Sequence, residues 1–311
     1  MKNIICVPFA FESGFNSGVN LKKNNRLEIY LKNASVALIS AKRNNPECDV
    51  VFATNISMKE LPCEFIEIMQ KNEIQILKVE FTAYTFPSEY KWALAFYKLC
   101  VLKHLIQIGF QNCCYMDTDV YVQGSFDNIW KECKHRILLY DVNHGLGVKE
   151  YRDIITEMNQ FCKNDLLLTH YGGEFFAANF ENSVIFEQQM DLTYKEMLER
   201  QFITTKGDEF IVSIVAERYK NLIKNASPYI CRFWTGASFR LISTCYEYNA
   251  VVILHMPAEK EKGIIKIYDK YISKNQIPTN SKVWKICRLN RMKLTEMIFV
   301  KVRKVFNRGD L

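Results

Sequence analysis

The chain has 311 residues, of which 49% are hydrophobic and 24% charged, and its formal net charge is +7. These values are those of an ordinary globular protein, and they exclude a disordered or collagen-like chain. The absence of any run of about 18 apolar residues excludes a helix that spans a membrane. The apolar stretch after Lys2 ends at Pro8, too soon for a secretory signal, and the 11 scattered cysteines are typical of a reducing compartment. We therefore expect a cytoplasmic protein.

The positive charge is concentrated near the C-terminus. From Lys282 to Leu311, nine basic residues stand against two acidic ones, so this stretch alone carries +7 and the preceding body is close to neutral. Aromatic residues such as Trp284 and Phe299 interleave with the basic ones. The pattern predicts a basic amphipathic segment over 271–311 that binds an anionic membrane surface, or else packs on the body or a partner. A near-neutral body argues against nucleic acid as a partner.

The first part of the chain alternates between strand and helix patterns. Apolar runs predict strands over 3–9, 49–54 and 74–79, and amphipathic periodicity predicts helices over 27–40 and 61–71. This alternation indicates an α/β fold, a mostly parallel sheet flanked by helices. Ligands of such sheets bind outside the carboxyl ends of the strands.

Two carboxylates follow the next apolar run, which begins at Cys113. Asp117 and Asp119 are two residues apart, so they point to the same side of a strand that continues through them. Aligned carboxylates repel each other unless a cation lies between them, and Mn²⁺ or Mg²⁺ takes such ligands while leaving positions free for phosphate. On these residues alone, one aspartate could equally cap the next turn while the other is solvated.

The surroundings of this pair favour the metal. A helix over 90–106 precedes it, and a second short strand, a turn and a short helix around Trp130 follow it. This order resembles the centre of the nucleotide-sugar glycosyltransferases with the GT-A fold, and the segment 115–122 is similar to their aspartate-x-aspartate motif. The resemblance implies a GT-A domain over 1–270, with a nucleotide-binding half over about 1–130 and an acceptor half over about 131–270.

The same resemblance implies ligands. Asp117 and Asp119 are expected to hold the metal ion that bridges the diphosphate of the donor, a UDP-sugar by preference. The acceptor is expected to be a glycan or a lipid-linked glycan of a bacterial surface polysaccharide, reached from the inner face of the plasma membrane. In the family the loop after the first strand grips the nucleotide, which makes Pro8, Phe9 and Ala10 candidates here; a plain strand–helix connection is the alternative.

Lys98 takes the place of a basic donor-binding residue, usually an arginine in the family. A lysine offers a point charge rather than a two-pronged donor, and a solvated helix lysine is the ordinary alternative.

Sugar-binding candidates come from the second half of the chain. Patterns predict a strand over 137–142, a helix over 150–161, a glycine-entered strand over 170–179 and a helix over 184–200. In the retaining glycosyltransferase families 6 and 8, a strand of small and aromatic residues at this point lines the sugars. The resemblance therefore implies that sugar or acceptor is bound by His170, Gly173, Glu174 and, in a strand over 227–234, Trp234. A tight turn into a core strand is the alternative.

Asp208 and Glu209 open the next predicted helix. Carboxylates are favoured there in any protein because of the helix dipole, so simple capping is the alternative reading. The corresponding pair in family 6 implies that Glu209 is the nucleophile or oxocarbenium stabiliser and that Asp208 orients the sugar hydroxyls. Net retention of configuration is predicted from this match alone.

A strand over 250–255 delivers His255 at its end, before a turn with Lys260 and Lys262. Family 8 closes its site in a similar way, which implies that His255 is the third metal ligand and that these lysines bind the diphosphate. Taken alone, such a histidine is more often structural.

Metal-dependent hexosyl transfer is thus the favoured hypothesis, with two rivals. A nucleotidyltransferase would share the sheet, metal and nucleotide, although the segment 10–20 lacks the Arg or Lys that its glycine-rich loop normally carries. A non-enzymatic protein that binds nucleic acid or membrane through its basic C-terminal segment is the second rival.

Overall fold

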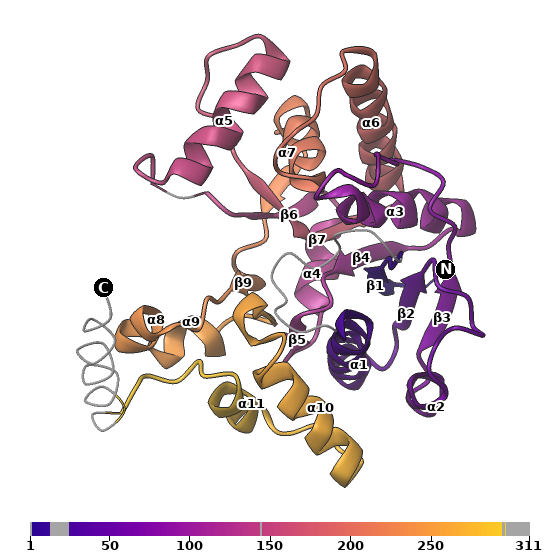
Figure 1. Ribbon diagram of the computed structural model, residues 1–311, viewed down its shortest axis with the longest axis vertical. Coiled ribbons are helices and arrows are strands. Elements are labelled where there is room, and N and C mark those ends of the chain that lie inside the picture. The colour runs from indigo at the N-terminus through magenta and orange to yellow at the C-terminus, as the bar shows by residue number, and fades with distance from the viewer. Residues whose placement is uncertain (1, 13–24, 144, 294–295, 297–311) are drawn as a thin grey trace.

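The computed structural model describes residues 2–12, 25–143, 145–293 and 296 (Figure 1). Their main feature is a sheet of seven strands in the order β3-β2-β1-β4-β7-β6-β8. The strands are β1 (Ile4–Phe9), β2 (Asp49–Thr54), β3 (Gln75–Lys78), β4 (Asn112–Met116), β6 (Ile137–Asp141), β7 (Tyr171–Asn179) and β8 (Ile223–Asn225). All neighbouring pairs are parallel except those that β7 makes with β4 and β6. The predicted mostly parallel α/β sheet is confirmed.

Alternate strand residues enter two separate cores. On β1, Ile5 and Val7 belong to one buried cluster, whereas Ile4 and Cys6 belong to the other, as the two-residue period of a strand requires. The first face is covered by α1 (Arg26–Asn44), α2 (Cys63–Lys71) and α10 (Gly263–Lys274). The second is covered by α3 (Tyr97–Ile108), α5 (Lys149–Cys162), α6 (Phe180–Glu199) and α7 (Asp208–Arg218). Figure 1 shows the two groups on opposite sides of the sheet.

A second, three-stranded sheet has the order β5-β10-β9 and consists of β5 (Val120–Val122), β9 (Ile230–Arg232) and β10 (Ile253–His255). Its register places His255 opposite Val120 on one side and opposite Arg232 on the other. The last residue of β10 is thereby held next to the Asp117–Asp119 segment, since β5 begins one residue after Asp119. The short helices α4 (Asp127–Cys133), α8 (Ala237–Ile242) and α9 (Cys245–Asn249) complete this part of the chain.

Two local predictions were wrong. The helix expected over 90–106 begins as a 3₁₀ turn at Ala93–Phe96 and becomes α3 only at Tyr97. The reason is that Tyr90 and Trp92 use their polar atoms to bind the loop before α7: Tyr90 Oη donates to Thr204 O at 2.7 Å and Trp92 Nε1 to Thr205 O at 2.7 Å. The apolar run from Cys113 also ends as a strand at Met116, and Val120 begins a strand of the other sheet, so the aspartate pair lies in the connection rather than within a continuous strand.

The C-terminal segment is not a free tail as far as it is described. The predicted boundary near 270 falls within α10, and α11 (Asn280–Ile286) follows. Val283, Cys287 and Leu289 are buried in the first core, and Trp284 Nε1 donates to Gln123 Oε1 at 2.8 Å. Residues 294–295 and 297–311 of the predicted amphipathic segment lie outside the described residues. The division into a nucleotide half and an acceptor half stays a prediction.

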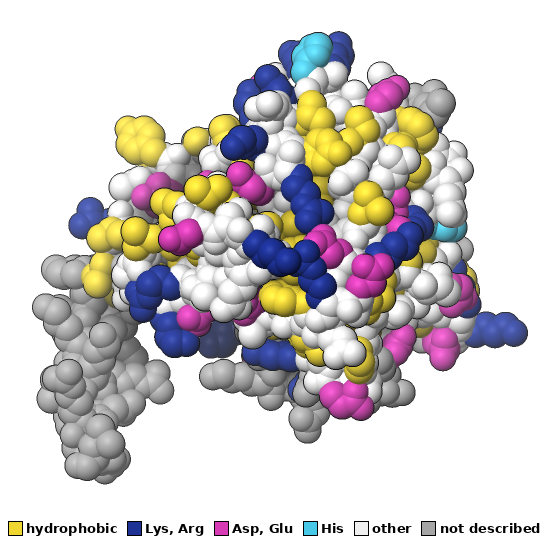
Figure 2. All heavy atoms as spheres, turned by 90° about the horizontal axis from the view of Figure 1, so that it is seen from above, with side chains coloured by type: hydrophobic (Ala, Val, Ile, Leu, Met, Phe, Trp, Pro, Cys, Tyr) yellow, Lys and Arg dark blue, Asp and Glu magenta, His cyan; other side chains and the backbone are white. Residues whose placement is uncertain are grey.

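The surface carries mixed charge on the face seen from above, where basic and acidic side chains are interspersed among apolar ones (Figure 2). Among the residues that the structure describes, none forms a helix long and apolar enough to cross a membrane.

Candidate active site

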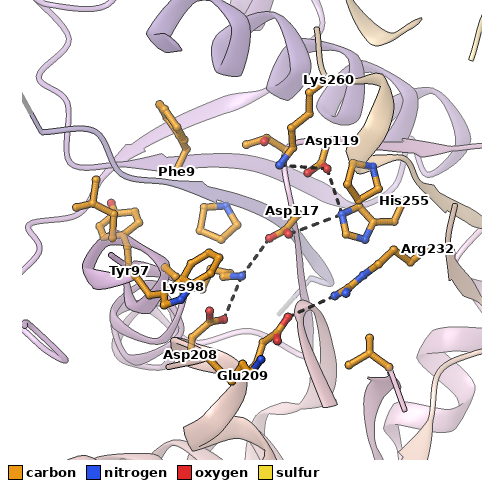
Figure 3. Close-up of a pocket in the computed structure, with 18 of the residues that line it drawn as sticks. Phe9, Tyr97, Lys98, Asp117, Asp119, Asp208, Glu209, Arg232, His255 and Lys260 are labelled. Carbon is orange, nitrogen blue, oxygen red and sulfur yellow. Dashed lines mark hydrogen bonds and ion pairs between the residues drawn. The ribbon is translucent and has the colours of Figure 1, made fainter. Parts of the chain in front are cut away.

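A cleft of about 450 Å³ opens where β1 and β4 end (Figure 3). Pro8, Phe9 and Ala10 line it at the end of β1, and the Phe9 ring packs against Tyr30 with ring centres 5.1 Å apart. The carboxyl ends of parallel strands are where ligands of such sheets bind, so the cleft has the position expected of a functional site. Other predicted residues that line it are Lys98, Asp117, Asp119, His170, Asp208, Glu209, Trp234, His255 and Lys260.

Asp117, Asp119 and His255 form a cluster that could hold a metal ion. One ligand atom from each lies within 4.8 Å of the others. His255 Nε2 is 3.2 Å from Asp119 Oδ2 and 3.8 Å from Asp117 Oδ2. Two carboxylates and one imidazole suit Mn²⁺, and the carboxylate pair also suits Mg²⁺. We call these three residues the metal triad.

Lys98 connects the metal triad to the start of α7. Its Nζ lies 3.1 Å from Asp117 Oδ1 and 3.0 Å from Asp208 Oδ2, and it donates to Gly173 O at 2.8 Å. Burial lowers the pKa of Lys98, but Asp117 and Asp208 more than offset this and hold it well above its ordinary value. Burial raises the pKa of Asp208 to about 6, although Lys98 opposes the shift. Lys98 is therefore a fixed cation within the site.

Arg232 is the important residue that sequence reasoning did not assign. It lies on β9 and grips Glu174 with two hydrogen bonds, Nε to Oε1 and Nη2 to Oε2, both 2.7 Å long. Its Nη2 also lies 3.3 Å from Glu209 Oε1. A lone arginine in the apolar run from Ile230 to Trp234 was the available signal, because a charge in such a run needs a buried partner. Which carboxylates it would meet could not be read from the sequence.

Glu209 lines the cleft, and each of its carboxylate oxygens contacts a nitrogen of a neighbouring side chain. His170 Nε2 is 2.9 Å from Glu209 Oε2, and Arg232 approaches the other oxygen. Burial alone would raise the pKa of Glu209, but the His170 hydrogen bond and the Arg232 charge lower it overall. Glu209 is therefore ionised at neutral pH, whereas the neighbouring Asp208 has its pKa raised. The two carboxylates that begin α7 have environments that separate their pKa values, a pattern that is common at catalytic sites.

Charge balance supports a divalent cation. The connected groups comprise three permanent cations, Lys98, Arg232 and Lys260, the last with its Nζ 3.3 Å from Asp119 Oδ2. Against them stand five carboxylates, those of Asp117, Asp119, Glu174, Asp208 and Glu209. When every carboxylate is ionised and His255 is neutral, as a metal ligand is, five negative charges against three positive ones leave two uncompensated among these connected groups. Because uncompensated buried charge is costly, a bound divalent ion fits both the ligands and the deficit.

Three predicted residues lie away from the cleft wall. Glu174 is only 1% exposed and sits behind the wall, where it holds Arg232 and lies 3.3 Å from His255 Nδ1. It therefore supports the site rather than facing a sugar. Gly173 also lies behind the wall, and Lys262 is exposed but does not line the cleft, unlike Lys260.

The paired glycines at the start of β7 make room for the ion pairs. A Cβ on Gly173 would lie 1.9 Å from Asp208 Oδ2, and one on Gly172 would lie 1.8 Å from Glu174 Oε2. Such distances are impossible, so any side chain at either position must displace a carboxylate. The resemblance implied that Gly173 binds a sugar or acceptor; in the structure the space beside the two glycines is occupied by the carboxylates of Asp208 and Glu174.

We expect Gly173→Ala to destabilise the fold by about 1–3 kcal/mol, the usual cost of overpacking, and to separate Lys98 from Asp208. Urea denaturation measures the loss of stability. Gly236→Ala is the matched control, because nothing lies within 4 Å of a Cβ at Gly236. Equal midpoints for the two variants would show that the Asp208 carboxylate does not need the space at Gly173.

Comparisons with known proteins identify the fold. No protein-family model matches the sequence, and no curated protein sequence matches it. The apo structure of the bifunctional glycosyltransferase WbbM has a TM-score of 0.55 at 8% identity, over 92% of this chain and 52% of that one. The apo structure of mouse xyloside xylosyltransferase 1 has a TM-score of 0.48 at 10% identity, over 82% and 96% of the two chains. That score is too low to carry an argument.

The protein therefore has the α/β fold of a GT-A-like glycosyltransferase, with an aspartate–aspartate–histidine triad at the edge of its sheet. The chain spans about half the length of WbbM. At this level of identity the similarity shows the fold alone. Membership of families 6 or 8 stays a prediction.

Proposed function

We propose that this protein is a metal-dependent glycosyltransferase, which moves a hexose from a nucleotide-diphosphate sugar to a glycan or lipid-linked acceptor. The observation that carries the proposal is the metal triad, placed at the carboxyl edge of a GT-A-like sheet within a network of ion pairs whose carboxylates outnumber its permanent cations by two. A divalent ion bound there would offset the excess of carboxylates and could hold a diphosphate at the carboxyl edge of the sheet.

Asp117, Asp119 and His255 hold Mn²⁺ or Mg²⁺ in this proposal. When bound, the ion neutralises the negative charge that develops on the departing diphosphate. Lys260, half-buried beside Asp119, adds a fixed positive charge to the cleft. Its Nζ lies over the Tyr30 ring, 5.6 Å from the ring centre. Pro8, Phe9 and Ala10 bind the nucleotide, with UDP the favoured one. Lys98 keeps Asp117 and Asp208 in fixed positions.

Glu209 is proposed to face the sugar and to stabilise positive charge at its anomeric carbon. An ionised carboxylate suits this role, and the lowered pKa of Glu209 supports its ionisation. Asp208 and His170 orient the sugar hydroxyls and Glu209, respectively. Net retention of configuration follows from this assignment.

Product analysis separates this proposal from a nucleotidyltransferase. The protein is incubated with a panel of UDP- and GDP-sugars and Mn²⁺, and products are resolved by anion-exchange chromatography. We expect release of the nucleoside diphosphate, stopped by EDTA. Formation of pyrophosphate from a nucleoside triphosphate and a sugar 1-phosphate, without diphosphate release from any donor, would support nucleotidyl transfer instead.

We further propose that the protein lies on the inner face of the plasma membrane through its C-terminal segment together with the neighbouring helices α8 and α9. Ile242 is 76% exposed and Tyr246 is 84% exposed. The chain after α11 lies against α8, since Met292 N donates to Arg240 O at 2.8 Å. It brings the exposed Arg288, Arg291 and Lys293 to this end of the molecule. Apolar side chains beside basic ones suit an anionic membrane surface.

We expect Ile242→Ser with Tyr246→Ser to reduce co-sedimentation with vesicles that contain phosphatidylserine, while donor hydrolysis is unchanged. The matched control is Leu198→Ser with Ile203→Ser, which removes two exposed apolar side chains, 51% and 61% exposed, elsewhere on the surface. Deleting residues 282–311 is not a suitable test of membrane binding, because the deletion would also remove the core residues Val283 and Cys287. Equal binding by both double variants would contradict the assignment of this surface.

A further inference from the structure

Two lysines at the cleft, Lys91 and Lys206, differ from its other cations. Lys98, Lys260 and Arg232 are all tied to carboxylates of the site. In the part of the chain that the structure describes, by contrast, neither Lys91 nor Lys206 has a carboxylate oxygen within 4.0 Å of its Nζ. Lys91 is exposed and Lys206 is half-buried, so both lie nearer solvent than the metal triad. We call them the outer lysine pair.

The two lysines are carried by neighbouring loops that are joined to each other. Trp92 Nε1 donates to Thr205 O at 2.7 Å, and Gly207 N donates to Tyr90 Oη at 3.2 Å. Gly207 has a φ of +70°, and a Cβ there would lie 3.0 Å from Trp92 Cβ, so the loops are in close contact. These contacts bring together, at the cleft, Lys91, which precedes Trp92, and Lys206, which follows Thr205.

Helix α5 fixes this arrangement from the other side. The Glu157 carboxylate accepts hydrogen bonds from Thr204 Oγ1 at 2.8 Å and from Thr205 N at 3.0 Å. Lys206 N in turn donates to Thr204 Oγ1 at 3.1 Å. Because the backbone on both sides of Lys206 is held in this way, little ordering is needed when a ligand binds.

Nearby acidic groups neutralise the outer lysine pair only in part. Asp153 of α5 has its pKa lowered mainly by its hydrogen bond to Lys149, 2.9 Å away, and also by the charge of Lys206, while Glu157 is occupied by the 204–205 loop. Glu150 is the acidic residue of α5 that lines the cleft. The three ammonium groups of Lys91, Lys206 and Lys149 stand against the two carboxylates of Glu150 and Asp153, which leaves one net positive charge at and beside the mouth.

Flat apolar surface lies beside this charge. Trp92 lines the cleft, and the Nζ of Lys91 lies 4.9 Å from the centre of the Trp92 ring. Trp234, which is 52% exposed, lines the cleft as well. Indole rings offer a flat apolar face with a polar edge, which suits the apolar face of a sugar ring. We propose that the mouth of the cleft is an acceptor subsite for a sugar that carries an anionic group, a carboxylate or a phosphate, bound by the outer lysine pair. This inference rests on the proposed glycosyltransferase function.

The test compares anionic sugars with neutral ones in the full-length protein. Binding of methyl glucuronide, glucose 6-phosphate and methyl glucoside is followed by tryptophan fluorescence and by ligand-observed NMR, each with and without UDP and Mn²⁺. We expect at least one anionic sugar to bind about tenfold more tightly than methyl glucoside, because a charge-assisted contact is added. The two anionic sugars distinguish carboxylate from phosphate. Added salt should reduce the preference.

Variants assign the preference to the outer lysine pair. Lys91→Ala with Lys206→Ala should remove the preference for the anionic sugar and leave the affinity for UDP with Mn²⁺ unchanged. Lys270→Ala with Lys274→Ala, which removes two exposed lysines of α10, is the charge-matched control and should keep the preference.

Three results would overturn the inference: no preference in the unmodified protein, a preference retained by the Lys91→Ala, Lys206→Ala variant, or a loss of UDP affinity in that variant. The last result would place the lysines on the donor diphosphate. If UDP binds and the sugars are not distinguished, this inference fails while the proposed function stands. If UDP does not bind at all, the proposed function fails independently of the sugar measurements.

Discussion

Asp117→Asn is expected to lower Mn²⁺-dependent donor turnover by on the order of 10³-fold while leaving the protein folded. The substitution removes one charged ligand of the metal triad and the counter-charge of Lys98, 3.1 Å away. The Asp117 side chain is 29% exposed, so an amide at this position can still be solvated. Mn²⁺ binding followed by electron paramagnetic resonance should weaken in parallel.

Asp119→Asn is the less informative change, because Asp119 is buried whereas Asp117 is partly exposed. The Asp119 side chain is 1% exposed, and its Oδ2 lies 3.3 Å from Lys260 Nζ and 3.2 Å from His255 Nε2. Removing one partner of a buried charge cluster costs about 3–5 kcal/mol, so lost activity would be confounded with lost stability. Asp269→Asn, at an exposed position on α10, is the control for Asp117→Asn. Full Mn²⁺-dependent turnover by Asp117→Asn would show that the metal triad does not hold the ion that turnover requires.

Glu209→Gln should lower turnover by about 10²-fold or more and change the affinity for UDP with Mn²⁺ little. The glutamine keeps the size of the side chain and can still meet Arg232 and His170, but it cannot supply the negative charge that those groups hold in place. Steady-state kinetics should therefore show the loss in kcat rather than in KM. Glu217→Gln, on the same helix and half-buried, is the matched control. Near-normal turnover by Glu209→Gln would leave this residue as a support for Arg232.

Stereochemistry tests the same assignment independently. A carboxylate on the sugar face opposite the leaving group predicts that an α-linked donor yields an α-linked product. The coupling constant of the new anomeric proton, measured by NMR, distinguishes the two outcomes. A β-linked product would refute retention and with it the role given to Glu209.

The metal triad was predictable because each member stands at the end of an apolar run. Asp117 and Asp119 follow β4, and His255 ends β10, so their positions at strand ends could be read from local sequence. That these strand ends meet depends on the β5–β10 pairing, which joins residues more than 130 positions apart. The family resemblance supplied that step, and the residue pattern alone could not.

Arg232 and Glu174 show why the rest was not predictable. Their pairing depends on a strand register and on the space left by Gly172, neither of which leaves a local signal. The resemblance implied that Glu174 binds a sugar, yet the space beside the two glycines is occupied by carboxylates of the protein itself. In the C-terminal segment, charge counting left open whether the segment binds a membrane or packs on the body, and Val283 and Leu289 anchor its first part in the core.

Nucleotide binding tests the central claim most directly. Isothermal titration calorimetry with UDP is performed on the unmodified protein and on Asp117→Asn, each with Mn²⁺ and with EDTA; a GDP titration checks the choice of base. The account predicts binding to the unmodified protein that requires Mn²⁺ and is strongly weakened in Asp117→Asn. Absence of binding for both nucleoside diphosphates in the presence of Mn²⁺, or equal binding in EDTA, would contradict it.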